Sequence, residues 1–579
     1  MKYKNKFLAS AIALGLGLTA NAQNNNFTIN GLGRSIISQN DLGGNLTKDN
    51  NSFQQSGTAG YNLFDLQTNL NVDSNFQAMA ILRAKSPFGA LFGQGTTFDF
   101  RQFAMMGKIG GFKYEIGDIR VQLSPYTVYN NDVIPGRTFE NALFSMRREI
   151  IEYENFNLGN TWLLQGLAGQ HFFKFNEEGK GLGIYAFTSR NVPTNDGGVP
   201  DRLLSGGNVE LRLSKGLKLG IHAVSMYDVN PFGAQFKYRN NVGTGYVNYF
   251  KENSKMYLQA RFEGGMSGYK FTQNPDAPTA VDSAYNDGFV DFDARLGLKK
   301  AKIKIDVNFR SVGVLFSSPS AQTRRINENA QMSMFTFLST PQIGLVRQQL
   351  LFDRFTSEDI YNSAITPNLM AFLPYYNNTN PYGKATPNRI GGELGISTDT
   401  SNHVLDASVK GSYFTEVQGE GGVAKRQFLL VNGGANVHLG KMLDMTRIFD
   451  INFGARYENT TRTQGALVDL NSTLIDAGLT FEVVKKLDFL VGMKSFTAKG
   501  NEFTTKRNGF NAIDPIDGFE EFFIDINEVI YSAGIRARFN KHQMFTLNYN
   551  FTDMQNNDKY LTSSSYNFGQ VFLHYRGIF

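Results

Sequence analysis

Strict alternation of apolar and polar residues is the feature that most limits what this chain can fold into. In residues 301–309 the odd positions are apolar, whereas the even positions carry Lys, Asp or Asn side chains. Residues 290–298 show the same pattern in the opposite phase. Successive side chains of a β-strand point to opposite faces. We therefore predict two strands, each with one apolar and one charged face, joined by a tight hairpin at Lys299 and Lys300.

The same alternation recurs elsewhere in the chain. It covers residues 529–539 and 545–552, and two further hairpins fit residues 209–223 and 475–493. All 15 prolines fall between the proposed strands, as expected because proline cannot donate a hydrogen bond to a sheet. We predict about 22 strands, within a range of 20 to 24, because single-chain bacterial barrels have an even number. Residues 139–153 fit either a strand or a short helix.

A soluble β-sandwich would also alternate, so strand length must separate the two folds. Many of the proposed strands run to about 10 residues or more, which is the length that crosses a bilayer when tilted. Their polar faces carry charges of both signs, as suits a wet interior in which opposite charges can pair. The predicted fold class is all-β: a single-chain antiparallel transmembrane β-barrel.

The amino terminus has the pattern of a secretory signal. Three lysines at positions 2, 4 and 6 precede an apolar run over residues 7–18, and Ala20-Asn21-Ala22 provides the small residues that a signal peptidase requires. The apolar run is too short for an uncleaved membrane anchor, which needs about 20 residues. We therefore assign residues 1–22 to a cleaved signal peptide and residues 23–579 to a barrel in the Gram-negative outer membrane.

Composition agrees with this class and excludes several others. Removing the signal takes away three lysines and no acid, which leaves 54 basic against 51 acidic residues. That near-balance argues against a nucleic-acid-binding protein. The absence of cysteine excludes disulfides, thiolate metal sites, a cysteine nucleophile and a lipid-modified amino-terminal cysteine. Aromatic residues make up 13% of the chain although its mean hydropathy is −0.29, a mixture typical of a barrel wall with aromatic girdles.

The last strand has the features of a barrel insertion signal. Val571, Leu573, Tyr575 and the terminal Phe579 lie on one face, opposite polar residues such as His574. We expect the barrel-assembly machinery to bind this strand, and outer-membrane lipid and lipopolysaccharide to surround the barrel. Other outer-membrane or surface proteins are expected partners of the long loops, and nucleic acid is not.

The longest irregular stretch, residues 315–389, contains six prolines and an asparagine-rich segment. A loop of this length is usually functional or disordered. It fits either a solvated surface loop or a lid that folds inward and narrows the lumen. Energy-coupled receptors with 22 strands carry a globular plug before the barrel, but here alternation already begins at residues 63–72. We therefore predict that an amino-terminal plug domain is absent.

Motifs for catalysis or metal binding are weak. The six histidines show no HExxH spacing. The acidic loop at residues 514–521 has hard oxygen ligands, but its spacing departs from that of an EF-hand. No glycine-rich phosphate loop opens a helix. We predict no catalytic residues, no metal site and no cofactor, and the protein is not expected to be an enzyme.

Several of these features together resemble large outer-membrane β-barrel proteins of the Bacteroidota type: the signal that ends before Gln23, the alternating hairpins, the asparagine-rich loops and the final Phe579. This resemblance covers the whole chain. In addition, residues 114–120 and 124–127 are similar to a strand and loop of porin-like and secretion- or biogenesis-associated barrels of that phylum. The resemblance implies a class of barrel, does not resolve a family, and transfers no site residues.

Two functions fit this sequence. The first is a porin-like channel, in which charged residues on the polar strand faces line the path and set the electrostatic barrier to charged solutes. The second is a structural subunit of an outer-membrane secretion or biogenesis assembly, with its loops as docking surfaces. The same charges could instead simply pair with one another. The candidate lumen-lining residues are Lys302, Lys304, Asp306, Arg310, Asp291, Asp293, Arg295, Arg536, Arg538, Glu210 and Arg212.

Overall fold

The computed structural model describes most of the chain. The described residues are 26–45, 56–73, 75–88, 95–128, 139–155, 164–176, 179–192, 200–229, 233–321, 325–326, 350–356, 361–362, 365, 368–399, 404–420, 423–505, 518–558 and 565–579. The predicted signal peptide at residues 1–22 and residues 514–517 of the acidic loop lie outside them.

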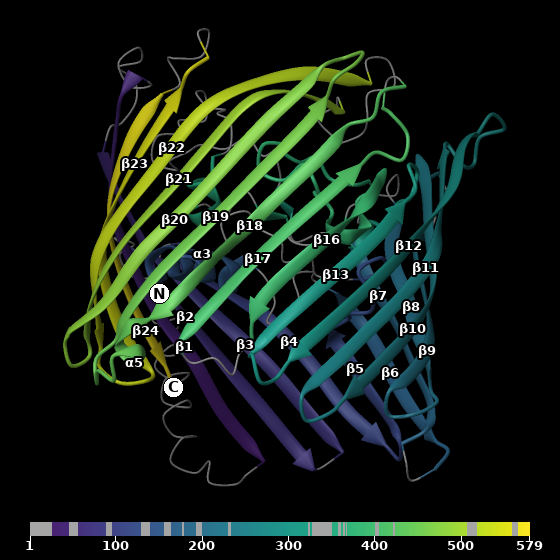
Figure 1. The fold of residues 1–579 in the computed structure, drawn as a ribbon. Helices are drawn as coiled ribbons and strands as arrows, with labels where there is room; N and C mark the ends of the chain where they lie inside the picture. The colour runs from purple at the N-terminus through teal and green to yellow at the C-terminus, as the bar shows by residue number, and fades with distance from the viewer. Residues whose placement is uncertain are drawn as a thin grey trace.

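Twenty-two antiparallel strands form one closed barrel (Figure 1). The ring closes because β1 (Phe27–Gly43) pairs with both β2 (Ser56–Asp73) and the last strand, β24 (Tyr566–Ile578). This confirms the predicted fold class and strand number. The other barrel strands are β3 (Phe76–Pro87), β4 (Thr97–Ile109), β5 (Phe112–Asp118), β6 (Gln165–Lys174), β7 (Gly181–Val192), β8 (Asp201–Arg212), β9 (Leu217–Val229), β10 (Phe236–Glu252), β11 (Met256–Gln273), β12 (Val281–Leu298), β13 (Ile303–Val312), β16 (Arg389–Thr398), β17 (Leu405–Thr415), β18 (Gln427–His438), β19 (Phe449–Arg462), β20 (Val468–Val484), β21 (Leu487–Thr505), β22 (Phe519–Arg538) and β23 (Gln543–Asn556). Two short strands, β14 (Arg325–Ile326) and β15 (Tyr361–Asn362), pair separately.

Alternation along each strand separates an outer apolar surface from the barrel interior. On β12, Val290 and Phe292 are 44% and 42% exposed, whereas Asp291 between them is only 2% exposed. Closure of the ring leaves no unpaired sheet edge, which is the condition for a sheet to cross lipid. The fold is that of an outer-membrane β-barrel, and the protein accordingly belongs in the outer membrane.

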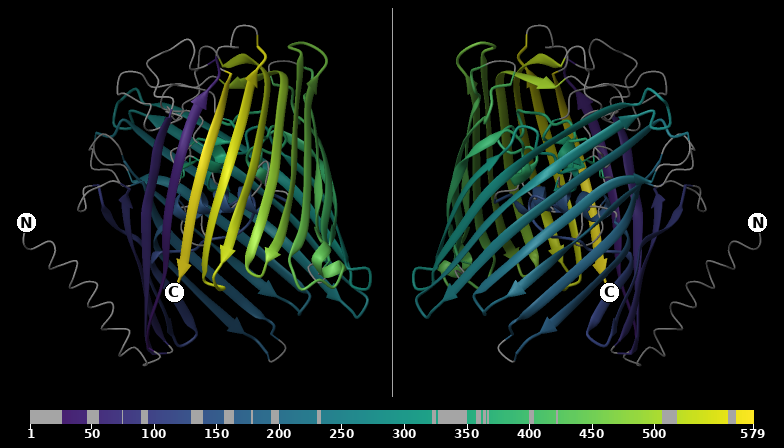
Figure 2. Two further views of the ribbon diagram at one scale, coloured as in Figure 1. Left: turned by 90° about the vertical axis from the view of Figure 1, so that its left-hand side faces the viewer. Right: turned by 90° about the vertical axis from the view of Figure 1, so that its right-hand side faces the viewer.

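The two ends of the barrel differ (Figure 2). One end carries short turns such as Gly110-Gly111 and Lys485-Lys486, and β24 ends there, whereas the other end carries the long connections. In bacterial barrels the short turns are periplasmic and the long loops extracellular. One predicted strand start differs from the structure: β13 begins at Ile303, because Lys302 has a φ of +54° and belongs to the turn.

Helices are few. The segment that fitted either a strand or a helix forms α3 (Ala142–Asn155). Its buried residues include Leu143 and Phe144 and, seven positions later, Ile150 and Ile151, which is a helical spacing. The other helices of the described ranges are α4 (Asp353–Thr356), α5 (Leu439–Met442) and the 3₁₀ turns η2 (Pro319–Ala321) and η3 (Gly383–Ala385). No helix within the described ranges is long and apolar enough to span a bilayer.

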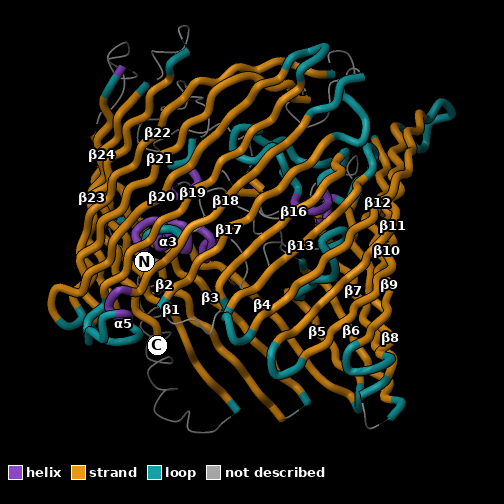
Figure 3. Tube along the Cα trace, viewed as in Figure 1, coloured by secondary structure: helices purple, strands orange, loops and turns teal. Residues whose placement is uncertain are grey.

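Two connections from the long-loop end fold back into the barrel (Figures 1 and 3). We call residues 119–128 and 139–155, between β5 and β6, the first insert. The second insert comprises residues 313–321, 350–356 and 368–388, between β13 and β16. Buried apolar clusters join both inserts to inward-facing wall residues such as Ile526 and Phe568. The interior is therefore partly dry and packed, whereas the strand pattern alone led us to expect an aqueous lumen. No separate plug domain is present among the described residues.

Candidate functional site

Lys494 of β21 holds the beginning of α3 in the first insert. Its ammonium lies 2.8 Å from Glu140 of the insert and 3.0 Å from Asp476 of β20, and all three side chains are at most 2% exposed. Asn141 caps the helix, since its Oδ1 accepts the N–H of Leu143 at 2.9 Å. A buried charge is costly unless it is paired. Lys494 of the wall and Glu140 of the insert therefore each provide the opposite charge that the other needs when buried.

The wall is glycine where the first insert touches it. A Cβ at Gly478 of β20 would overlap Asn141, and a Cβ at Gly492 of β21 would lie 3.0 Å from the ring of Phe144. Any other residue at these inward positions would push the insert away. The inner wall is therefore shaped to receive this segment.

The carboxyl-terminal end of α3 is held by charged residues of β1, β2 and β3. Glu154 pairs with Arg34 of β1 at 2.8 Å and with Lys85 of β3 at 3.2 Å. The hydroxyl of Tyr153 donates to Asp65 of β2 at 2.6 Å. Burial and this carboxylate raise the pKa of Tyr153 to about 12, so the phenol stays neutral. The helix thus runs inside the barrel from the wall at β20–β21 to the wall at β1–β3.

A wall carboxylate accepts hydrogen bonds from the main chain of the second insert within residues 350–356. Glu528 of β22 accepts the N–H of Leu351 and the N–H of Phe352, each at 2.9 Å. Asp353 closes the same turn by accepting the N–H of Leu350 at 2.8 Å. Hydrogen bonds to an ionised acceptor are stronger than neutral ones. Glu528 is 1% exposed and faces the lumen, so it fixes this segment to the wall.

Another buried carboxylate holds the asparagine-rich part of the second insert. Oε1 of Glu458, on β19, accepts the N–H of Asn378 at 2.9 Å and both the N–H and the hydroxyl of Thr379 at 2.6 Å. Its Oε2 lies 2.6 Å from Arg456 of the same strand. The side-chain amide of Asn378 donates to Glu502 of β21 at 2.6 Å. This part of the long predicted loop therefore folds inward rather than into solvent.

The two inserts also contact each other. Ser320 donates its hydroxyl to the main-chain oxygen of Thr127 at 2.7 Å. The ring of Tyr126 meets Phe316 of the second insert edge-on at 6.3 Å, and Phe144 lies 6.4 Å from Phe355, both measured between ring centres. The inserts therefore form one body across the lumen.

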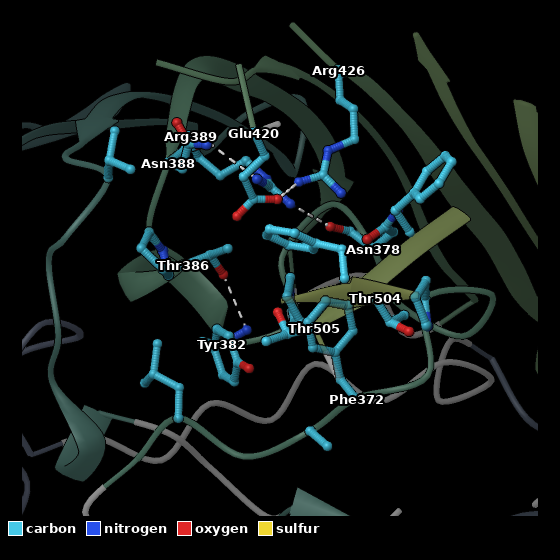
Figure 4. Close-up of a pocket in the computed structure, with 18 of the residues that line it drawn as sticks. Phe372, Asn378, Tyr382, Thr386, Asn388, Arg389, Glu420, Arg426, Thr504 and Thr505 are labelled. Carbon is cyan, nitrogen blue, oxygen red and sulfur yellow. Dashed lines mark hydrogen bonds and ion pairs between the residues drawn. The ribbon is translucent and has the colours of Figure 1, made fainter. Parts of the chain in front are cut away.

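A cavity of about 520 Å³ opens at the long-loop end, beside the second insert (Figure 4). Figure 4 shows Arg389 and Arg426 on one side of it and Tyr382, Thr386 and Phe372 on the others. We call it the outer cavity. Its lining includes Tyr269, Tyr285, Ser317, Phe372, Tyr382, Asn388, Arg389, Glu420, Arg426, Glu502, Phe503, Thr504, Thr505 and Phe522.

The structure places the predicted lumen-lining residues as follows. All except Lys302 lie on strands with their side chains toward the lumen, and Lys302 lies in a turn. Their ion pairs join residues of one strand or of nearby strands, or reach the second insert. The pairs are Arg310 with Glu393 at 2.9 Å, Lys304 with Asp399 at 3.5 Å, Lys384 with Asp291 at 3.4 Å and also with Asp293, Arg295 with Asp306, Glu210 with Arg212 at 2.9 Å and with Lys218 at 3.7 Å, Arg536 and Arg538 with Asp488 at 2.9 and 2.8 Å, and Arg538 with Glu482 at 2.8 Å.

The predicted insertion signal lies on the outer face of β24. Val571 and Phe579 are 44% and 53% exposed there, and Phe579 stacks on Phe64 of β2 at 5.5 Å. Its role in assembly stays a prediction, as does the role of the lumen charges in selecting solutes.

Sequence reasoning missed the residues that hold the inserts. Lys494, Glu458, Glu528 and Asp65 all face inward, yet their partners come from distant parts of the chain. One signal was available. Among the inward-facing positions of residues 524–530, Glu528 is the only acid, and the others are Ile524, Ile526 and Ile530. A charge among buried apolar positions indicates a specific partner.

Comparison with solved structures finds other outer-membrane barrels. OccAB4 of Acinetobacter baumannii aligns at 9% identity and a TM-score of 0.33, over 96% of this chain and 100% of that chain. OccK1 (OpdK) of Pseudomonas aeruginosa aligns at 9% and 0.34, over 96% and 98%. The ferric citrate transporter FecA aligns at 9% and 0.47, over 95% and 78%. No protein-family model and no curated protein sequence matches this chain. Similarity this low transfers no residue role or ligand.

Proposed function

We propose that this protein is a porin-like outer-membrane channel whose lumen is narrowed by the two inserts, so that it passes selected solutes rather than acting as an open pore. The observation that carries this proposal is the docking of the second insert on the buried carboxylates of Glu458 and Glu528. A barrel of 22 strands would otherwise enclose a wide lumen.

The exposed charges favour a path along one side of the lumen. On the inner wall of β12–β17, the side chains of Arg295, Asp306 and Lys410 are 51%, 41% and 44% exposed. Arg310, above them and bonded to Asn380 of the second insert at 2.6 Å, is only 1% exposed. The outer cavity borders the same side through residues of β11, β12 and β16. We place the narrowest part of the path beside Arg310, between this cavity and the exposed charges.

Planar-bilayer recording tests the proposal. We expect the wild-type protein to give small, steady openings. A variant with residues 314–387 replaced by a short Gly-Ser linker should give much larger ones, because the second insert no longer fills the lumen. The variant also controls for insertion into the bilayer. A silent wild-type protein beside a conducting variant would mean a sealed barrel, and the channel function would be rejected.

The second function expected from the sequence, a structural subunit with its loops as docking surfaces, gains no support from the described residues. The described part of the 313–388 connection is turned to the lumen and largely buried. We retain as proposals the cleavage of residues 1–22 and the recognition of β24 by the assembly machinery, and likewise the Bacteroidota-type membership.

A further inference from the structure

We infer that the outer cavity binds an uncharged, hydroxyl-rich ring compound, and that short neutral oligosaccharides are the class of solute it selects. This inference rests on the proposed channel function, because a binding site at the long-loop mouth then lies at the entrance of the path. The volume of about 520 Å³ falls within the range of pockets that hold small ligands.

Position supports an entrance site. The cavity is formed by the second insert together with strands from two sides of the barrel, namely β11 and β12 on one side and β21 and β22 on the other. A ligand held there would contact the segment that narrows the lumen. Binding and passage would therefore involve the same residues.

The donors of the first cavity arginine, Arg389, are already bonded within the protein. Arg389 donates to the main-chain oxygens of Asn378, Thr379 and Asn388 at 2.9 to 3.1 Å. The guanidinium of Arg389 also stacks on the ring of Phe428, at 3.6 Å from its centre. An anionic ligand would have to compete with these bonds. Arg389 is therefore a structural cation rather than an anion receptor.

The second cavity arginine, Arg426, is paired with carboxylates. Arg426 pairs with Glu416 at 2.6 Å, with Glu502 at 3.1 Å, and with Glu420. The same pairs occupy Glu420 and Glu502. Glu520, the third acid that lines the cavity, is not in these pairs but is exposed to solvent, where an ion pair adds little free energy. Separating buried partners leaves charges without compensation and is costly. An ionic solute consequently gains little in this cavity.

Aromatic rings supply flat apolar faces instead. Tyr269 and Tyr285 stack at 4.5 Å with an interplanar angle of 10°. Phe372 of the second insert meets Tyr382 edge-on, at 5.7 Å and 83°. All four rings line the cavity. Aromatic rings offer a large, rigid contact surface at low entropic cost.

Uncharged hydroxyl groups complete the lining. Thr504 and Thr505 lie at the end of β21, on the cavity side opposite Arg389 in Figure 4. Neither hydroxyl has a hydrogen-bond partner within the part of the chain that the structure describes. A sugar ring has an apolar C–H face and a rim of hydroxyl groups. It can stack on the aromatic rings while its rim bonds to threonine.

Calorimetric titration of the detergent-purified full-length protein tests the inference. The neutral probes are maltotriose, cellotriose and xylotriose, and the charged probes are trigalacturonate and chitosan trimer. We expect at least one neutral trisaccharide to bind about tenfold more tightly than either charged one, because charged probes must displace existing ion pairs. Binding of a charged trisaccharide at equal or greater affinity, or no binding of any neutral one, would overturn the inference.

Variants locate the site. Phe372→Ala should weaken binding of the preferred trisaccharide about tenfold by removing a stacking face. Thr505→Val, which keeps the side-chain volume, should weaken it several-fold. Phe175→Ala, which changes an exposed aromatic residue at the short-turn end, is the matched control and should bind as wild type does. Equal affinity in all three variants would place binding elsewhere and refute the inference.

The two proposals fail separately. Calorimetry needs no ion current, so a protein that conducts but binds no neutral sugar refutes only the ligand class. A protein that binds the sugar but conducts nothing refutes only the channel.

Discussion

At the scale of single residues, the barrel interior is organised by carboxylates that accept main-chain N–H groups. Glu528 shows this most clearly, because it takes two successive N–H groups from residues 351 and 352. These N–H groups directly precede α4, so a carboxylate on the wall satisfies groups that would otherwise be buried without partners. Glu528 thereby fixes residues 350–353 of the insert to the wall.

Replacing Glu528 by Gln should loosen the second insert. The amide oxygen can accept one of the two N–H groups, but the amide nitrogen would face the other. We expect a loss of about 1–3 kcal/mol in docking free energy. The measurement is the rate of proteolytic cleavage within residues 313–388 of the folded barrel in detergent, which should rise. Glu521→Gln, an exposed outward position on the same strand, is the control. Equal cleavage rates in the two variants would show that the carboxylate does not hold the insert.

At the scale of elements, strands were predictable from sequence and inserts were not. Alternation is a local property of the extended backbone, so Val290 and Asp291 could be assigned to opposite faces without knowing the partner strands. The pattern placed the start of β13 too early. The polarity of Lys302 gives no information on its backbone, which has a positive φ and belongs to the turn. The docking of Glu140 on Lys494 joins residues 354 positions apart, which no local pattern encodes. Inward folding of residues 315–389 was therefore one open alternative rather than a prediction.

The α3 part of the first insert should be dispensable for the barrel itself. β5 and β6 pair directly through seven residue pairs from Phe112–His171 to Asp118–Gln165, so their ladder does not need α3. We expect a variant with residues 129–163 replaced by a short Gly-Ser linker to keep the heat-modifiable gel mobility of a folded barrel and to conduct more than wild type. A variant that no longer migrates as a folded barrel would show that α3 is part of the folding core.

At the scale of the whole molecule, the protein consists of a closed ring of strands and a packed interior body formed by the two inserts. The ring satisfies its own main chain and supplies the lipid-facing surface. The inserts pack against β19–β24 and β1–β3 and also against β6–β10. Exposed inward charges remain on β12–β17 and at Arg212 of β8. Composition and periodicity predict the ring, because every strand in it has the same alternation of inward and outward side chains. The location of the inserts depends on contacts made once each, such as that of Asn378 with Thr460 at 3.0 Å.

Cysteine cross-linking tests most directly whether the second insert lies inside the barrel, because the natural chain contains no cysteine. The variant Asn378→Cys with Thr460→Cys places one thiol on the insert and one on the inner face of β19, where the native side chains are in hydrogen-bond contact. The control variant pairs Asn378→Cys with Tyr457→Cys, on the outer face of the same strand. In native membranes, we expect a short bifunctional thiol reagent to join residues 378 and 460 in most molecules and to leave the control pair unjoined. Failure to join 378 with 460, or equal joining in the control, would contradict a lumen narrowed by the chain's own insert.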